Sequence, residues 1–202
     1  MTDPLLFARE YPWTDWSRNL VSWAEQQLAS DTVRQHSLTK ESENHRIHYS
    51  CPAEQLPSWI QSGLPQNVSI AYLNIFSTRA GSLGRIHRDI NYRSAAFNIP
   101  IGLPAGSQQW YLRPFQEHTV YLGGRRDLPL IFTEEELDPA LFGSFEPDYS
   151  LCVRQPTLVN LDYWHRTNAL DCTEPRWVVS LRFRPDPSYA SLRVLFDQGY
   201  RT

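Results

Sequence analysis

Two periodicities divide the chain into a helical start, a long strand-rich middle and a helical end. Near the N-terminus, apolar residues recur with the i, i+3, i+4, i+8 spacing of a single helical face: Leu20, Trp23, Ala24 and Leu28. We expect a helix from Trp16 to about His36, capped by Asp15, that packs on a sheet. A second short helix is expected from Ala53 to Ser62, closed by Gly63, and a third from Ser188 to Gln198.

The middle of the chain carries the pattern of strands. Short runs rich in β-branched and aromatic residues are separated by turn residues. The runs expected to form strands are 45–49, 68–76, 93–101, 109–112, 119–122, 157–161 and 176–183. Fifteen prolines and nine glycines favour turns between strands as short as these.

The segment 127–149 has no clear pattern. Thr133 to Leu137 is expected to begin a short helix if the segment holds any regular element, because Pro139 and Pro147 limit what can form there. Two interpretations stay open: the segment covers the functional site as a lid, or it is a surface excursion.

Helices at both ends around many short strands predict one domain over residues 1–202. Its β core is expected at about 68–184, with helical N-terminal and C-terminal flanks. A chain of 202 residues, 41% of them hydrophobic, is long enough to bury a sizeable core. The expected fold class is mainly β, a β-sandwich or jelly roll supported by helices.

Charge and cysteine usage narrow the partners and the compartment. The net charge is −3 and no long Lys/Arg run occurs, so nucleic acid is not an expected partner. No apolar run reaches eighteen residues, so no membrane segment is expected, and the N-terminal residues do not resemble a signal peptide. Three widely spaced cysteines, Cys51, Cys152 and Cys172, are expected to be free thiols in a reducing cytoplasm. The oligomeric state is not indicated.

His87 and Asp89 stand two positions apart in a segment expected to be extended. Residues i and i+2 of a strand point to the same face, so one imidazole and one carboxylate can share a metal ion. His165, in Tyr163-Trp164-His165, is the best candidate for a third ligand. Two histidines and one carboxylate on one side of a metal leave open positions opposite, as in non-haem Fe(II) oxygenases. The alternative for His87 alone is a surface or hydrogen-bonded histidine.

His165 follows Asp89 by 76 residues, and Arg176 follows His165 by eleven. This order, His-x-Asp, a long gap, His and then Arg, resembles Fe(II)- and 2-oxoglutarate-dependent dioxygenases over about residues 70–183. The most similar branches are the aspartyl/asparaginyl β-hydroxylase-like and prolyl/phytanoyl hydroxylase-like enzymes. The resemblance implies a double-stranded β-helix, a cupin-like jelly roll, that uses Fe(II), 2-oxoglutarate and O2. It also implies that His87, Asp89 and His165 are the iron ligands and catalytic residues, while Arg176 binds the far carboxylate of 2-oxoglutarate.

Three more residues are candidates for contact with 2-oxoglutarate: Tyr72, Asn74 and Asn98. Tyr72 and Asn74 share one face of a strand, and Asn98 lies in a strand where related enzymes often place such a contact. The alternatives are core packing for Tyr72 and a side chain satisfied by neighbouring backbone for Asn98. Arg182 and Arg184 are rivals to Arg176, with less suitable spacing.

Arg93 and Trp110 are candidates for contact with the substrate. The alternative is a surface ion pair for Arg93 and a place in the core or pocket wall for Trp110. Asn168 is expected to fix a local turn or to support His165, and Arg88 is expected to point away from the metal.

The function expected from the resemblance is a hydroxylating oxygenase that releases succinate and CO2. Its substrate would be an amino-acid-like small molecule or a peptide or protein side chain. Asp89 fills a coordination position that a halide would need, which favours hydroxylation over halogenation. Two other hypotheses remain: a non-catalytic jelly-roll or cupin-like protein that binds a metal or metabolite, and a Zn or Mn enzyme such as an isomerase. Zn or Mn sites of that kind usually have more histidine ligands than the two found in this set.

Overall fold

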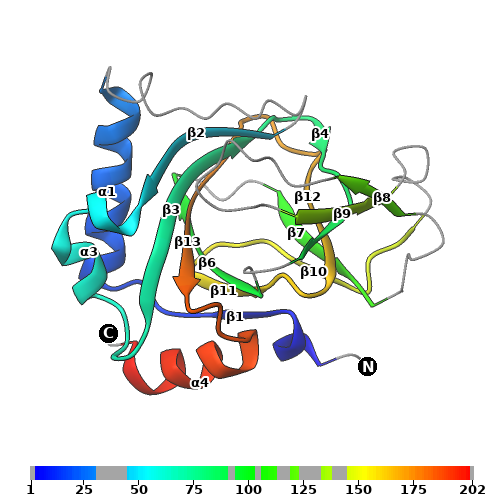
Figure 1. Cartoon of the computed structure of the whole chain (residues 1–202). Helices are drawn as coiled ribbons and strands as arrows, with labels where there is room; N and C mark the ends of the chain where they lie inside the picture. Colours follow the sequence, from blue (N-terminus) through cyan, green and yellow to red (C-terminus); the bar gives the residue numbers. More distant parts are fainter. Residues whose placement is uncertain are drawn as a thin grey trace.

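The computed structural model describes residues 3–30, 45–90, 94–102, 106–112, 119–122, 133–137 and 145–200. For residues 45, 46, 90, 119–122 and 133–137 it describes the backbone alone. Two antiparallel sheets face one another, and helices cover the outer side of one of them (Figure 1). The fold is thus mainly β with flanking helices and has the two facing antiparallel sheets of a jelly roll, and the expected fold class is confirmed.

The first sheet has six strands. In spatial order they are β1 (Ala8–Glu10), β11 (Thr157–Asn160), β6 (Ala95–Ile101), β13 (Arg176–Arg184), β3 (Ser69–Thr78) and β2 (His45–Pro52). The second sheet has seven. Its main path is β10 (Tyr149–Leu151), β7 (Ser107–Tyr111), β12 (Trp164–Ala169), β5 (His87–Ile90), β9 (Thr133–Leu137) and β8 (Thr119–Leu122), and β4 (Ser82–Leu83) also pairs with β12.

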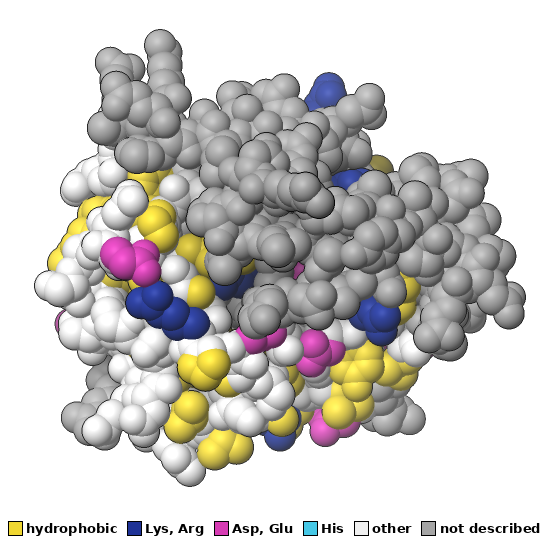
Figure 2. All heavy atoms as spheres, viewed as in Figure 1, with side chains coloured by type: hydrophobic (Ala, Val, Ile, Leu, Met, Phe, Trp, Pro, Cys, Tyr) yellow, Lys and Arg dark blue, Asp and Glu magenta, His cyan; other side chains and the backbone are white. Residues whose placement is uncertain are grey.

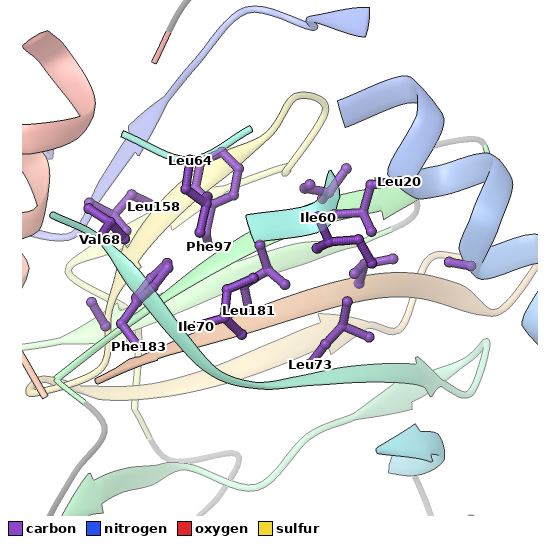
Figure 3. Packing of buried hydrophobic residues seen from close by; sticks show 14 of the residues in the cluster. Leu20, Ile60, Leu64, Val68, Ile70, Leu73, Phe97, Leu158, Leu181 and Phe183 are labelled. Carbon is purple, nitrogen blue, oxygen red and sulfur yellow. The ribbon is translucent and has the colours of Figure 1, made fainter. Parts of the chain in front are cut away.

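The six-stranded sheet has one apolar face and one largely polar face, because successive side chains of a strand alternate between the two. The apolar face carries Leu73, Phe97, Val179 and Leu181, all fully buried. It packs against helices α1 (Asp15–Ala29), α3 (Ser58–Ser62) and α4 (Tyr189–Gly199), through residues such as Leu20, Ile60 and Phe196 (Figure 3 shows Leu20 and Ile60). The polar face is turned toward the second sheet, and this is where the site lies.

Helix α1 begins and ends differently from the prediction. The N-cap is Thr14, not Asp15: Thr14 Oγ1 accepts from the Ser17 amide at 3.1 Å, and Ser17 Oγ accepts from the Thr14 amide at 2.9 Å. This reciprocal pair satisfies two groups at once, which a carboxylate in the first turn does not do. The helix ends at Ala29, and the rest of the predicted helix falls in 31–44, outside the described residues.

The helix predicted over 53–62 is divided in two. A 3-10 turn, η2 (Ala53–Gln55), precedes α3, and Pro57 stands as the N-cap between them. Another 3-10 turn, η1 (Pro4–Leu6), begins the chain. Gly63 follows α3 as predicted but keeps a right-handed conformation. A Cβ at this position would overlap the indole of Trp16, so close packing of α1 on α3 requires the glycine.

Residues 133–137 form strand β9, so the prediction of a helix there is wrong. The backbone pairs with β5 on one side and with β8 on the other. Pairing with two strands outweighs the helical preference of three consecutive glutamates, because strand formation depends on tertiary neighbours more than on intrinsic propensity. Most of 127–149 lies outside the described residues, so its role as a lid stays a prediction.

The three cysteines are free thiols, as expected, and Cys51 is buried. Among the described residues, no helix is both long and apolar enough to cross a membrane. On the face seen in Figure 2, the described acidic and basic side chains are interspersed with hydrophobic ones.

Candidate metal centre

Strand pairing brings the two candidate histidines together. His87 on β5 and His165 on β12 are register partners in the seven-stranded sheet, and their ring centroids lie 4.4 Å apart. Asp89, two residues after His87 on the same strand face, completes the group. One ligand atom from each of the three residues lies within 4.8 Å of the others. The predicted set His87, Asp89 and His165 is therefore assembled in the fold.

Each imidazole is fixed by a backbone carbonyl two residues before it. His87 Nδ1 lies 3.0 Å from the Arg85 carbonyl oxygen, and His165 Nδ1 lies 2.8 Å from that of Tyr163. An Nδ1–H that donates to a carbonyl leaves the Nε2 lone pair free, which is the usual arrangement of a metal-binding histidine. His87 Nε2 is also the atom that faces Asp89, 3.9 Å from Oδ1.

Burial of the candidate ligands sets the protonation state of His165. His165 is 4% exposed and Asp89 is 7% exposed, while His87 is half-buried. Burial, and next the neighbouring His87, lower the pKa of His165 to about 4. His165 is therefore neutral at pH 7, the form that binds a metal.

Two more carboxylates lie close to Asp89. Burial raises the pKa of Asp186, and a hydrogen bond from the Ser94 amide (3.1 Å) and the charge of Arg182 oppose this. Burial also raises the pKa of Asp162, where a bond with Ser94 opposes it. Neither residue was a sequence candidate, because each follows the end of a strand and carries no motif.

The polar face of the six-stranded sheet holds several buried groups that lack partners. Arg176 is 4% exposed, and its Nη1 and Nη2 have no hydrogen-bond partner among the described residues. The same holds for Asn74 Oδ1, Asn98 Oδ1 and Ser180 Oγ. Burial lowers the pKa of Arg176 to about 10, so it remains a cation at neutral pH. Buried polar groups without partners are rare in folded proteins, and a bound polar ligand is one way to satisfy them.

These groups lie in register across three neighbouring strands. Ser180 on β13 pairs with Asn74 on β3 and with Asn98 on β6, and Arg182 pairs with Tyr72 on β3. All of them face the second sheet, where the three candidate ligands lie. The four residues predicted to contact 2-oxoglutarate, Tyr72, Asn74, Asn98 and Arg176, thus share one interior face.

The donor set fits a divalent metal and a dicarboxylic keto acid. Two imidazoles with free Nε2 atoms and one carboxylate suit Fe(II) and leave coordination positions open. Arg176 and Arg182 stand six residues apart on the inner face of β13, which places their Cα atoms about 20 Å apart. Two long side chains at that separation leave room between them for a short dicarboxylate.

The position of Arg182 does not match the interpretation that it is an alternative to Arg176 for binding the far carboxylate. Its Nη2 lies 3.6 Å from Asp89 Oδ2, so it belongs to the metal end of the interior face and not to the Arg176 end. Arg176, Ser180 and Arg182 are separated by even numbers of residues, which places all three side chains on one face of the strand. This spacing could have indicated Ser180 as a site residue, but Ser180 was not among the sequence candidates. Arg184 points elsewhere and pairs with Glu54 at 3.0 Å on the surface.

The remaining candidates are placed as follows. Trp110 is fully buried, pairs with His165 across β7 and β12, and donates its indole N–H to the Asn160 carbonyl at 2.9 Å. It packs in a cluster with Phe7 and Val159, and a contact with substrate stays a prediction. Asn168 accepts from the Leu170 amide at 3.0 Å and so fixes a local turn, as expected. Arg93 lies outside the described residues.

Arg88 lies between the two ligands of β5 and takes no part in the metal site. Its guanidinium is 5.7 Å from the ring centroid of Trp164, the residue before His165. Because Trp164 and His165 are neighbours on β12, they point to opposite faces. Arg88 therefore lies on the outer face of the sheet, as expected.

The fold and the site together define a jelly-roll protein with a two-histidine, one-aspartate candidate metal centre. The sequence matches no family model, and no curated protein matches it. Two similar solved structures are oxalate decarboxylases of Bacillus subtilis, one from work on the EPR of its Mn(II) centres and one at pH 4.6.

The two likenesses are distant. The first has 10% sequence identity and a TM-score of 0.34, over 77% of this chain and 29% of the other. The second has 9% identity and a TM-score of 0.32, over 71% and 26%. The match thus spans under a third of each decarboxylase chain. At this level it carries no argument about the metal or the reaction of this protein.

Proposed function

We propose that this protein is an Fe(II)- and 2-oxoglutarate-dependent oxygenase that hydroxylates its substrate with release of succinate and CO2. The observation that carries the proposal is the arrangement of two groups on facing sheets. His87, Asp89 and His165 form a facial ligand set on one sheet, and Arg176 lies buried on the other with two donors that have no partner among the described residues. A protein that only stores or senses a metal has no need of a buried, unpartnered arginine.

Each residue has a defined role in this proposal. His87, Asp89 and His165 bind Fe(II) from one side, and the iron with its keto acid and O2 supplies the oxidising chemistry. The carbonyls of Arg85 and Tyr163 hold the two imidazoles in the orientation that presents Nε2. Arg176 donates to the far carboxylate of 2-oxoglutarate, for which its planar fork of donors is suited.

The polar row between Arg176 and the metal orients the keto acid. Asn74, Asn98 and Ser180 can donate and accept hydrogen bonds along the length of the ligand. The substrate class proposed is an amino-acid-like small molecule or a peptide or protein side chain. Arg93 and Trp110 remain the proposed substrate contacts, and the proposed location is the cytoplasm.

The proposal is tested with purified protein, Fe(II) and 2-oxoglutarate. Without O2, the mixture is expected to show a weak visible charge-transfer band. With O2, succinate release is expected in a screen of amino acids and short peptides, and Asp89→Ala is expected to abolish both signals while the fold survives. Asp171→Ala, at an exposed aspartate in the turn between β12 and β13, is the matched control. A protein that binds Fe(II) at His87 and His165 but gives neither band nor succinate is a non-catalytic metal-binding protein.

A further inference from the structure

Four side chains lie in one row across the inner face of the seven-stranded sheet. Each is the register partner of the next, in the order Tyr149 on β10, Trp110 on β7, His165 on β12 and His87 on β5. Register partners on antiparallel strands point to the same face, and their Cβ atoms lie about 4.5–5.5 Å apart. The row therefore joins two candidate metal ligands to a pair of large aromatic side chains.

The row leads from the closed interior toward solvent. Trp110 is fully buried, whereas Tyr149 is half-buried on β10, the end strand of the sheet's main path. The two rings are neighbours, with centroids 5.6 Å apart and planes tilted by 31°. Phe7 packs on both, at centroid distances of 5.9 Å from Trp110 and 5.4 Å from Tyr149. An aromatic path thus runs from beside His165 to the edge of the sheet.

Trp110 and Tyr149 can each be oxidised by one electron, because indole and phenol lose an electron far more readily than the phenylalanine ring does. They differ in what happens to the proton. The indole N–H of Trp110 donates to the Asn160 carbonyl at 2.9 Å, away from water, so an oxidised Trp110 has no base to take its proton. Burial, and next Glu10, raise the pKa of Tyr149, which is therefore a phenol at neutral pH. An oxidised Tyr149 releases that proton to solvent, so the oxidising equivalent moves from Trp110 to Tyr149.

We infer that Trp110 and Tyr149 form an electron relay that protects the metal site when it is oxidised without substrate. Trp110 gives one electron to the oxidised site, and Tyr149 gives one electron to Trp110 and its phenolic proton to solvent. A one-electron reductant such as ascorbate returns the tyrosyl radical to phenol with one electron and one proton. Two such transfers supply the two electrons that, with two protons, reduce the unused oxygen atom to water. This inference rests on the metal centre of the proposed function and gives Trp110 a role in addition to the proposed contact with substrate.

The test uses Fe(II)-loaded protein without substrate, in two arms. One arm receives 2-oxoglutarate and O2, and the other receives H2O2, which oxidises the bound iron without the keto acid. Freeze-quench EPR detects a tyrosyl radical, and peptide mass spectrometry locates added oxygen. The variants are Trp110→Phe and Tyr149→Phe, which keep an aromatic ring at each position. Tyr200→Phe is the matched control, because Tyr200 is also half-buried but packs with α4 on the other side of the six-stranded sheet.

A relay gives each variant a different pattern. The wild type shows the radical signal and added oxygen at Tyr149, and Tyr200 stays unmodified. Trp110→Phe loses both signals at Tyr149, because the link between the metal site and the edge of the sheet is broken. Tyr149→Phe loses the radical signal, and added oxygen appears on Trp110, where the oxidising equivalent is now retained. Ascorbate prevents the modification of Tyr149 in the wild type but does not protect Trp110 in Tyr149→Phe. Tyr200→Phe behaves as the wild type.

Three results overturn the relay. If folded Trp110→Phe oxidises Tyr149 as the wild type does, the path does not pass through Trp110. If Tyr200 is modified as much as Tyr149, radicals free in solution are responsible. If Tyr149 stays unmodified in both arms, no relay operates, and succinate release in the first arm then leaves the proposed function intact.

The two arms also separate the relay from the proposed function. Oxidation of Tyr149 with H2O2, but not with 2-oxoglutarate and O2, supports the relay and contradicts the proposed function instead. Circular dichroism and the melting temperature of each variant establish that it is folded.

Discussion

His87 and His165 are register partners on adjacent antiparallel strands, and their imidazole centroids lie 4.4 Å apart. The pairing of β5 with β12 thus sets the distance between two ligands from distant parts of the sequence. Asp89 follows by strand alternation from His87, so one pairing of backbones positions the whole ligand set. Four predictions follow from this arrangement and from the two faces of the six-stranded sheet.

Removal of one ligand is expected to abolish tight metal binding without unfolding the protein. His165→Ala leaves two ligands, and its Co(II) affinity should fall at least about 100-fold. That is the upper end of the loss found when only a residue that hydrogen-bonds to a metal ligand is removed. Equilibrium dialysis measures the affinity. His48→Ala is the control, since His48 Nε2 lies 2.8 Å from Ser77 Oγ and its ring packs at a tilt against Trp177, on the opposite face of the sheet from the site. Equal affinity in His165→Ala and the wild type would remove His165 from the ligand set.

The stability of the metal-free protein is expected to fall as the pH is lowered from about 6.5 toward 4. The folded-state pKa of His165 is lowered to about 4 by burial and by His87, whereas an unfolded histidine titrates near 6.5. Between these values unfolding takes up a proton, so acid favours the unfolded state. At pH 5 the loss from this residue is on the order of 2 kcal/mol relative to pH 7. Urea unfolding at both pH values measures it, and His165→Gln should lose this part of the pH dependence.

Arg176→Gln is expected to raise the 2-oxoglutarate concentration needed for half-maximal succinate release, about 10- to 100-fold. Its Nη1 and Nη2 are buried without a partner among the described residues, and it lies six residues along β13 from Arg182, the arginine beside Asp89, so turnover at saturating 2-oxoglutarate should change less. Succinate release against 2-oxoglutarate concentration separates the two effects. Arg154→Gln, at an exposed arginine, is the control. An unchanged requirement would exclude Arg176 as the anchor of the far carboxylate.

Phe97 and Asn98 are neighbours on β6 that face opposite sides of the sheet, and their substitution by alanine should have opposite consequences. Phe97 is fully buried against Tyr11 and Phe196, so Phe97→Ala should cost about 3–5 kcal/mol of unfolding free energy. Asn98 Oδ1 is buried and has no hydrogen-bond partner in the described part of the chain, so Asn98→Ala should leave stability unchanged or slightly higher. It should weaken 2-oxoglutarate binding. Denaturant unfolding and calorimetry test the pair, and a large loss of stability in Asn98→Ala would show that its side chain is satisfied within the protein.

Local pattern was sufficient for much of the fold and for the ligand set. Runs rich in β-branched and aromatic residues along 68–76, 93–101 and 176–183 predicted the three long strands at the centre of the six-stranded sheet, because such residues suit a strand with one face buried against helices. The spacing of His87 and Asp89 predicted that both face one side, which holds for a strand of any length. These properties depend on residues close together in the chain.

Other features depend on neighbours that the sequence does not identify. Residues 133–137 became a strand because β5 and β8 lie on either side. His165 lies within strand β12, not merely after a strand, because β12 pairs with β5 and β7. The Arg182–Asp89 contact joins the two sheets, and no local spacing predicts which residues will meet across an interior.

The sequence alone therefore determined where the central strands run, the apolar face of the first helix and the three side chains suited to a metal. Those properties follow from local geometry and from the chemistry of the side chains. Only the tertiary structure decided which strands pair, which donors remain free in the interior and which arginine lies beside Asp89. Such contacts are set by packing of segments distant in the sequence, and burial between the sheets is what makes each of them energetically important.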